Sequence, residues 1–227
     1  MAYPALSWID GMATTASAEA DGITVRLADG SAHSGKRLIL AIGVSDTLPP
    51  VKGLAERWGN SILHCPYCHG YELDGQPIAV LASGEIAIHQ ALVCADWGPV
   101  TLLLNDAFVP ADADLQALAA RKIATERSAV TRIEGTADVR LADGRVLPFA
   151  GIFVAPRNAP STGLAATLGC AVEESPFGTQ IRVDGTGETS VPGVFACGDA
   201  AAAPHSISLA VASGAMTGAR AHQSLIF

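Results

Sequence analysis

The chain has 227 residues, of which 49% are hydrophobic and 16% charged, so it can bury a sizeable core and is not a disordered segment. Its formal net charge of −8 argues against nucleic acid or an anionic membrane as partner, because both attract basic proteins. No membrane-spanning apolar run and no leader sequence is found, so we expect a cytoplasmic protein.

The N-terminal residues predict one hairpin. We expect residues 1–21, which are mostly small and polar, to be irregular apart from a short strand near Leu6 to Ile9. Ile23 to Leu27 alternates between apolar and polar side chains and meets Ala28-Asp29-Gly30, a combination that predicts a β-hairpin.

A strand and a linker follow the hairpin. Arg37 to Gly43 is an apolar run closed by glycine, which predicts a strand buried on both faces. Residues 46–53, with two adjacent prolines, predict a linker, and Leu54 to Trp58 predicts a short helical turn.

The motif Cys65-Pro66-Tyr67-Cys68-His69-Gly70 contains the one pair of cysteines that lie close together in the sequence. In a protein without an export signal, a Cys-x-x-Cys pair beside a βαβ pattern predicts a redox-active dithiol rather than a structural disulfide. His69, His64 and His205 are candidates for moving the thiol protons, with His69 first because it adjoins Cys68.

Two other kinds of site use similar residues. Cys-x-x-Cys-His is also the attachment signature of c-type haem, but that route requires export and an axial ligand. Zinc requires four tetrahedral ligands, and His64, Cys65, Cys68 and His69 are too contiguous to supply them, so no metal is expected. Cys94 lies on the apolar face of an expected helix and is predicted to be buried and inert.

The middle of the chain predicts the opening of a Rossmann-like domain. Ile78 to Ala82 and Val100 to Leu104 are apolar runs typical of buried strands, and Glu85 to Asp96 has helical spacing. With a tight turn at Ser83-Gly84, these segments form a βαβ unit. Asp112 to Lys122 predicts a further helix.

One segment occurs twice. Val25-Arg26-Leu27-Ala28-Asp29-Gly30 returns as Val139-Arg140-Leu141-Ala142-Asp143-Gly144, and each copy precedes an apolar run, Leu38 to Gly43 and Gly151 to Ala155. Two chance hairpins would explain this, but we favour two domains of similar plan. Ile78 lies 61 residues before Val139 (139 − 78), and the same interval before Val25 falls ahead of residue 1. We therefore expect the first domain to lack its opening strand, phosphate-binding turn and first helix.

The C-terminal part predicts a ligand-binding edge. A strand within Ser190 to Cys197 ends in Gly198-Asp199-Ala200, which places a carboxylate at the carboxyl end of a strand, where α/β folds bind ligands. Ser208 to His222 predicts a helix rich in small residues, which a flat ligand can approach closely.

Together these motifs resemble the thioredoxin-reductase-like family of FAD- and pyridine-nucleotide-dependent disulfide oxidoreductases. The resemblance is carried by Leu40-Ala41-Ile42-Gly43, the Cys65/Cys68 pair with Gly70, Gly151 to Ala155, and Val191-Pro192-Gly193 through Gly198-Asp199-Ala200. It implies an α/β fold of two Rossmann-like three-layer domains, one inserted in the other and the first incomplete. The FAD-binding-like domain would cover 1–56 plus 153–227, and an inserted NAD(P)-binding-like domain carrying the Cys pair would cover 57–152. A homodimer is also implied.

The resemblance implies roles for the residues of the motif. Cys68 would be the thiol nearest the flavin, and Cys65 would exchange with the substrate. His69 stands where most of the family has an acidic residue. This motif is typical of a branch that resembles dithiol oxidases, which form disulfides in small molecules and pass the electrons through FAD to oxygen.

The resemblance also implies an FAD site. Asp199 would bind the ribityl or phosphate region, with Gly198 and Ala200 allowing close backbone approach. Gly43 would line the site from the other side. The helix that begins near Ser208 would point its N-terminus, with its partial positive charge, at the flavin.

The nucleotide-binding motifs depart from the family pattern. The Gly-x-Gly-x-x-Gly turn for FAD is absent, and the second turn reads Ala82-Ser83-Gly84-Glu85-Ile86-Ala87. Loss of the first glycine and a negative charge at Glu85 both disfavour a pyrophosphate. Leu104 to Phe108 offers no basic residue for an NADP 2′-phosphate. These departures argue against NADPH.

Two hypotheses follow. The favoured one is a flavin-dependent thiol–disulfide oxidoreductase that uses FAD and acts on a small-molecule or protein dithiol or disulfide. The alternative is a non-catalytic truncated remnant that acts as a binding or redox-sensing module, because one phosphate turn is missing and the other is altered.

Overall fold

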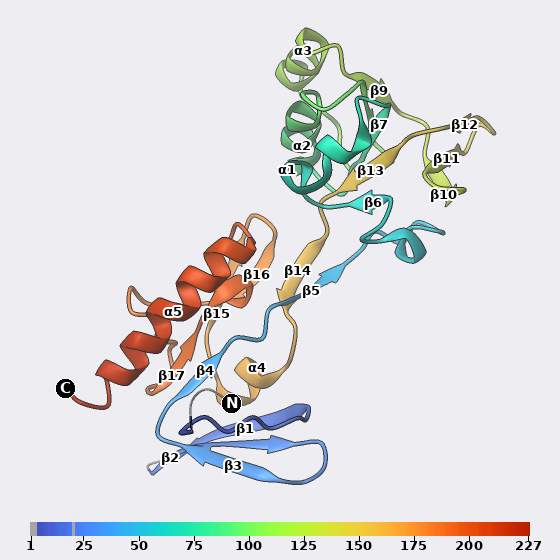
Figure 1. Ribbon diagram of the computed structural model, residues 1–227. Helices are drawn as coiled ribbons and strands as arrows, with labels where there is room; N and C mark the ends of the chain where they lie inside the picture. The colour runs from blue at the N-terminus through green and yellow to red at the C-terminus, as the bar shows by residue number, and fades with distance from the viewer. Residues whose placement is uncertain (1–3, 20) are drawn as a thin grey trace. The chain divides into compact units, whose positions relative to one another are not determined.

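The computed structural model describes residues 4–19 and 21–227, and the chain divides into two compact units (Figure 1). Unit 1 comprises Met1–Asp46 and Asn158–Phe227, and unit 2 comprises Thr47–Arg157. Both domain boundaries expected from the sequence, after residues 56 and 152, fall inside unit 2. The segment before residue 56 belongs there because Leu54 is buried in the unit 2 core and the carbonyl of Lys52 accepts a hydrogen bond from Ile133 N at 2.8 Å.

Unit 2 contains a five-stranded parallel sheet in the order β6-β13-β7-β8-β9. The strands are β6 (Ile62–Leu63), β7 (Ile78–Leu81), β8 (Val100–Leu103), β9 (Ala124–Glu126) and β13 (Gly151–Val154). Helix α2 (Ile86–Cys94) connects β7 to β8, and α3 (Asp112–Ala120) connects β8 to β9. The predicted Rossmann-like βαβ unit is confirmed.

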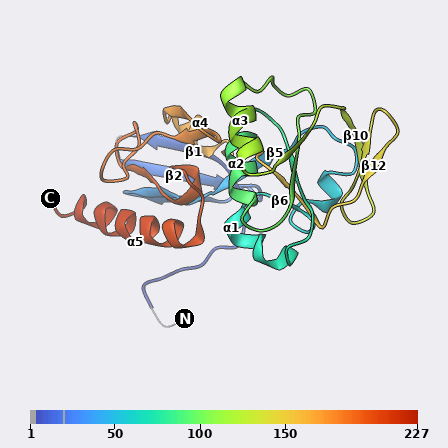
Figure 2. The same cartoon turned by 90° about the horizontal axis from the view of Figure 1, so that it is seen from above.

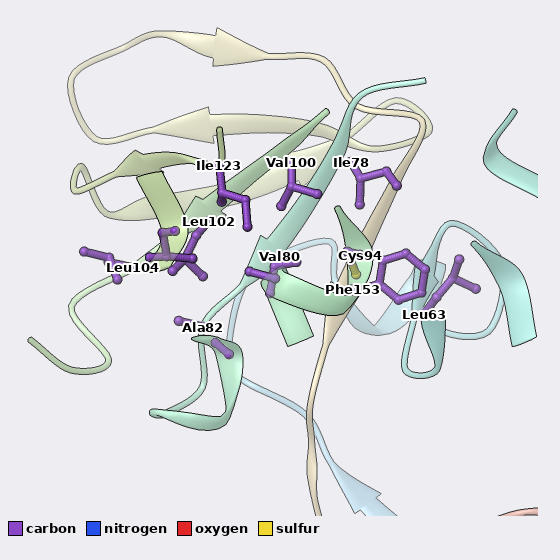
Figure 3. Packing of buried hydrophobic residues seen from close by; sticks show 13 residues of the cluster. Leu63, Ile78, Val80, Ala82, Cys94, Val100, Leu102, Leu104, Ile123 and Phe153 are labelled. Atoms are coloured by element: carbon purple, nitrogen blue, oxygen red, sulfur yellow. The ribbon is translucent and has the colours of Figure 1, made fainter. Parts of the chain in front are cut away.

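The sheet of unit 2 is covered on both faces. Val80, Leu102 and Phe153 point to one face, where they pack with Cys94 of α2 and with Ile123 (Figure 3). Their sequence neighbours point to the opposite face, because successive side chains of a strand alternate. This two-sided burial is why the strands appear in the sequence as continuous apolar runs.

The repeated segment forms the same structure twice. In unit 1, β1 (Ala13–Glu19), β2 (Gly22–Leu27) and β3 (Ala32–Gly35) form an antiparallel three-stranded sheet. In unit 2, β10 (Val130–Glu134), β11 (Asp138–Leu141) and β12 (Val146–Leu147) do the same. The turns match: Gly30 N donates to Leu27 O and Gly144 N donates to Leu141 O, both at 3.1 Å. The predicted hairpin is confirmed, and the repeat extends to three strands in each unit.

The N-terminal prediction is wrong in the described residues. Ala13–Glu19 is a strand rather than irregular, and Leu6 to Ile9 forms no strand. The strand is made of small and polar residues, so it has no hydrophobic period, and its pairing with β2 determines its conformation. The part of this prediction that concerns residues 1–3 and 20 lies outside the described residues.

Unit 1 contains two further sheets. Strands β4 (Leu38–Leu40) and β17 (Val194–Ala196) pair in parallel, and a four-stranded sheet has the order β15-β16-β14-β5. The strands of that sheet are β5 (Val44–Thr47), β14 (Arg157–Pro160), β15 (Val172–Ser175) and β16 (Gly178–Ile181). Helix α4 (Leu164–Leu168) packs on β1 (Figures 1 and 2). Helix α5 (Ile207–Gln223) packs against β4 and β17.

Two predictions for the segment after β3 need correction. Arg37 to Gly43 was expected to be buried on both faces, but Ile39 is 37% exposed, because β4 has only one neighbouring strand in the described part of unit 1. The linker expected over 46–53 begins inside strand β5. None of the helices in the described part of the chain has the length and apolar character that a membrane crossing requires.

Candidate active site

The two cysteines of the motif lie at the start of a one-turn helix, α1 (Pro66–His69). Cys65 is extended, as a residue before proline prefers, and Pro66 occupies the first helical position, where proline is well tolerated. The turn brings the thiols together: Cys68 Sγ donates to Cys65 Sγ at 2.7 Å. The pair therefore needs little movement to close a disulfide.

The environment of the thiols makes them unequal. Cys68 is exposed and Cys65 is half-buried. The hydrogen bond to Cys65 is the main reason why the pKa of Cys68 is raised to about 11, with burial adding to it. At neutral pH Cys68 therefore keeps its proton, and thiol chemistry at this pair requires a group that can move protons.

His69 is the predicted proton-transfer residue that directly follows Cys68 in the chain. It ends α1, and its Nδ1 lies 3.2 Å from Oε2 of Glu72 in the short helix η2 (Tyr71–Leu73). His64 precedes Cys65, and its Nδ1 lies 3.4 Å from the carbonyl of Val154.

The third predicted histidine, His205, lies in unit 1 rather than in the unit that carries the Cys pair. Its ring packs against Phe177, with the two ring centroids 6.2 Å apart. Of the three candidates, His69 and His64 therefore share a unit with the thiols.

One residue of α2 and one in the loop after it support the Cys pair. Gln90 is buried and donates from Nε2 to the carbonyl of His64 at 2.8 Å. Trp97 packs directly on Gly70, where an added Cβ would lie 2.5 Å from the indole ring. Glycine at position 70 is thus required by close packing.

A cavity of about 490 Å³ in unit 1 contains two of the five predicted cofactor residues, Gly198 and Asp199. It is also lined by Ala202, Ala203, Pro204, Leu209, Ala210, Ala212, Ser213 and Met216. Gly198 N donates to Ser213 Oγ at 3.0 Å, which joins the strand end to α5. One face of α5 therefore forms a wall of this cavity.

The other three predicted cofactor residues are not among those lining the cavity. Ala200 is buried in the core of unit 1, and Ser208 is exposed in the first turn of α5. Gly43 is half-buried with φ of +67°, and its carbonyl accepts a hydrogen bond from Ser161 N at 3.1 Å. Their roles toward FAD stay predictions.

The cavity fits part of a dinucleotide cofactor. Its size is within the range of about 300–1,000 Å³ that is common for ligand sites. Its alanines keep side chains small enough for a flat ring to reach the backbone, and Asp199 offers a carboxylate to hydroxyl groups. The chain has no Gly-x-Gly-x-x-Gly turn for the phosphates.

The second candidate nucleotide site, in unit 2, fits a pyrophosphate poorly. Glu85 is exposed immediately before α2, where a phosphate would need positive potential. Ser83 Oγ donates to the carbonyl of Ala155, so this hydroxyl is already bonded. After β8, Asn105 Oδ1 accepts from Val130 N at 2.8 Å, and Asp106 is acidic and exposed.

Sequence reasoning missed four residues that the fold brings to these sites. Glu72 was detectable in principle, because it lies three positions after His69 and residues at that spacing meet on a helix. Gln90, Trp97 and Ser213 had no signal, since their partners lie 15 to 27 residues away in the chain.

The chain matches a known protein family over most of its length. The model described as "Pyridine nucleotide-disulphide oxidoreductase" matches residues 9–215. Thioredoxin reductase tcpT of Claviceps purpurea is 33% identical over 99% of this chain and 74% of its own length. Thioredoxin reductase sirT of Leptosphaeria maculans is 30% identical over 83% of this chain and 63% of its own length.

A further relative and two solved structures are also similar to this chain over most of its length. An alkyl hydroperoxide reductase component of Pseudomonas putida is 33% identical over 95% of this chain and 44% of its own length. The crystal structure of an oxidoreductase from Agrobacterium tumefaciens is 44% identical with a TM-score of 0.96, covering all of this chain and 77% of that one. The structure of HlmI is 34% identical with a TM-score of 0.83, covering 96% and 70%. The chain thus spans between about two fifths and three quarters of these proteins.

Proposed function

Because this chain belongs to the pyridine nucleotide-disulphide oxidoreductase family, in its thioredoxin-reductase-like group, we propose that it is a flavin-dependent thiol–disulfide oxidoreductase. Cys65 and Cys68 exchange electrons with a dithiol or disulfide substrate. The observation that carries the proposal is the 2.7 Å separation of the two sulfur atoms across the one-turn helix α1.

With a dithiol substrate, the reaction is two successive thiol–disulfide exchanges at the Cys65–Cys68 disulfide. One substrate thiolate attacks a sulfur of the Cys65–Cys68 disulfide, the S–S bond breaks, and the other cysteine leaves as a thiolate. The second substrate thiol then attacks the mixed disulfide, which releases the substrate as a disulfide. Two electrons enter the Cys pair, and the two substrate protons end on Cys65 and Cys68. With a disulfide substrate the same steps run in reverse.

His69 moves the protons in this scheme. It is adjacent to Cys68, and imidazole can both accept and donate a proton near neutral pH. A cysteine that leaves as a thiolate in this exchange takes up a proton to become a thiol, and His69 supplies that proton. Cys65 as the thiol that meets substrate and Cys68 as the thiol nearest the flavin remain implications of the family resemblance.

Proteins of this family normally bind FAD, which supplies a two-electron redox partner for the Cys pair when bound. Gly198, Asp199 and Ser213 would hold it in the unit 1 cavity, with Gly43, Ala200 and Ser208 as further predicted contacts. We propose molecular oxygen rather than NADPH as the other substrate, because the turn at Ala82 to Ala87 and the loop after β8 do not suit a phosphorylated dinucleotide.

The substrate is proposed to be a small-molecule or protein dithiol or disulfide, and the active form a homodimer. The test is oxygen uptake by the full chain supplied with FAD and a small dithiol such as dithiothreitol, compared with NADPH oxidation under the same conditions. We expect dithiol-dependent oxygen uptake that Cys68→Ser abolishes and that the control Cys170→Ala leaves in place. A chain that binds no FAD but still forms the Cys65–Cys68 disulfide would instead support the redox-sensing alternative.

A further inference from the structure

The contact between His69 and Glu72 begins at the residue that directly follows Cys68 in the chain. Helix α1 ends at His69 and η2 begins at Tyr71, so the two side chains lie three residues apart on successive turns. Nδ1 of His69 and Oε2 of Glu72 are 3.2 Å apart. This is hydrogen-bond distance for an imidazole N–H and a carboxylate.

The backbone that connects the two residues is held by packing. A Cβ on Gly70 would lie 2.5 Å from Trp97 and 2.7 Å from the carbonyl of Pro66, so only glycine fits at this point of close packing. Gly70 N donates to Pro66 O at 2.7 Å, and Leu73 N donates to Gly70 O at 3.2 Å. The spacing of His69 and Glu72 is therefore set by the fold rather than by two freely rotating segments.

This contact has a chemical consequence for the imidazole. A neutral imidazole carries one proton, and a carboxylate at Nδ1 favours the tautomer in which Nδ1 is protonated. The lone pair is then on Nε2, away from Glu72. A carboxylate that orients a histidine in this way is a recurring arrangement in proton-transfer sites, where the histidine touches the reacting group and the carboxylate acts through it.

We propose that Glu72 is a positioning residue that holds His69 with its proton on Nδ1, so that Nε2 exchanges protons with the Cys65–Cys68 pair. The proposal rests on the proposed function, because only a pair that is oxidised and reduced must repeatedly gain and lose protons. The ordinary alternative is a solvated ion pair: the side chains of His69 and Glu72 are 42% and 70% exposed. Such an exposed pair contributes little to stability, so stability measurements do not separate the two possibilities.

The first test reads the tautomer directly. The full chain, reduced and without added flavin, is labelled with ¹⁵N-histidine, and the His69 ring nitrogens are assigned with a His69→Gln variant. We expect the Nδ1–H form in the wild type, the Nε2–H form that unconstrained histidine prefers in Glu72→Ala, and retention of Nδ1–H in Glu72→Gln, whose amide oxygen still accepts. The control is Asp74→Asn, which removes the same charge two residues away. An Nε2–H tautomer in the wild type, or one unchanged by Glu72→Ala, overturns the proposal.

The second test reads the chemistry without flavin. The Cys65–Cys68 disulfide is formed with diamide, and its reduction by dithiothreitol is followed at neutral pH by mass spectrometry. Loss of His69 as His69→Ala should slow reduction about 100-fold, and Glu72→Ala about tenfold. Glu72→Gln should recover part of the rate, and Asp74→Asn should match the wild type. Equal rates for Glu72→Ala and wild type overturn the proposal, whereas a chain that shows these rates but no FAD-dependent activity contradicts only the proposed function.

Discussion

The side chain of Gln90 donates a hydrogen bond to the backbone carbonyl of His64 at 2.8 Å, and this bond joins helix α2 to the residue that precedes Cys65. Gln90 is buried, and its Oε1 has no hydrogen-bond partner among the described residues. The side-chain nitrogen of Gln90 is therefore hydrogen-bonded to the carbonyl that precedes Cys65, while its side-chain oxygen is buried without a partner in the described part of the chain. The amide can make up to four hydrogen bonds, and the one described for Gln90 joins α2 to the redox motif.

Gln90→Met, which keeps the length of the side chain and removes the amide, should lower the free energy of unfolding by about 1 kcal/mol. The loss is small because the change removes the hydrogen bond from Gln90 to His64 but also removes an unpartnered buried oxygen. Urea unfolding measures it, with His89→Met on the exposed side of α2 as the matched control. A Gln90→Met protein as stable as wild type, with unchanged hydrogen exchange at Leu63 to Cys68, would contradict a supporting role.

Cys65→Ala should make Cys68 more reactive at neutral pH. The hydrogen bond to Cys65 is the largest cause of the raised pKa of Cys68, about 11, so removing Cys65 should move that pKa down toward the ordinary thiol range near 8.5. Because only the thiolate reacts, the rate of alkylation by iodoacetamide at pH 8 should rise by about tenfold or more, each unit of pKa giving a factor of ten.

The measurement is the alkylation rate of Cys68 between pH 7 and 11 by site-resolved mass spectrometry. In the variant, the rise in rate should be centred at lower pH than in the reduced wild type. Cys94 serves as the internal control, since burial raises its pKa to about 12 and it should stay unmodified in both proteins. An identical pH profile for Cys68 in the two proteins would show that the hydrogen bond to Cys65 does not raise the pKa of Cys68.

The sequence was sufficient for elements whose burial is continuous or periodic. The ends of β7, β8 and α2 were predicted to within two residues. The strands are covered on both faces and therefore contain unbroken apolar side chains. Burial of Cys94 was predicted from its helix face and is confirmed. β14 was not predicted: it contains Arg157 and Pro160, and pairing with distant strands gives it its conformation.

The candidate site likewise contains residues that the sequence predicts and residues that only the folded chain brings together. Cys65, Cys68 and His69 are neighbours in sequence, so their proximity follows from one turn of helix. Gln90 and Ser213 reach their partners only after the chain has folded, across 26 and 15 residues, and no local pattern marks them. The sequence patterns that predict the strands and the Cys motif do not show that the Gln90 amide will reach His64 or that the Ser213 hydroxyl will reach Gly198.

Ala212→Phe should weaken FAD binding by at least tenfold. Ala212 lines the unit 1 cavity, as Asp199 does, and a phenyl ring at position 212 would occupy space that a flat cofactor needs. Binding is measured by equilibrium dialysis with FAD, and circular dichroism verifies the fold. Ala219→Phe is the control, because Ala219 is exposed on α5 and does not line the cavity. Equal affinity of Ala212→Phe and wild type for FAD would show that the flavin does not bind in this cavity.

Gly30→Ala and Gly144→Ala should each destabilise their own three-stranded sheet by a similar amount. Gly30 and Gly144 have φ of +87° and +91°, and an added Cβ at either would meet nothing within 4 Å, so the cost is backbone strain alone, about 1–2 kcal/mol. Asparagine, which tolerates positive φ better, should cost less at both sites. Hydrogen exchange read by mass spectrometry separates the effects, since Gly30→Ala should act on β1 to β3 and Gly144→Ala on β10 to β12. The two turns share a further hydrogen bond: Asp29 Oδ1 accepts from Ser31 N at 2.8 Å, and Asp143 Oδ1 accepts from Arg145 N at 3.0 Å. Markedly unequal losses of stability in the two variants would therefore contradict the view that the turns are copies of one structure.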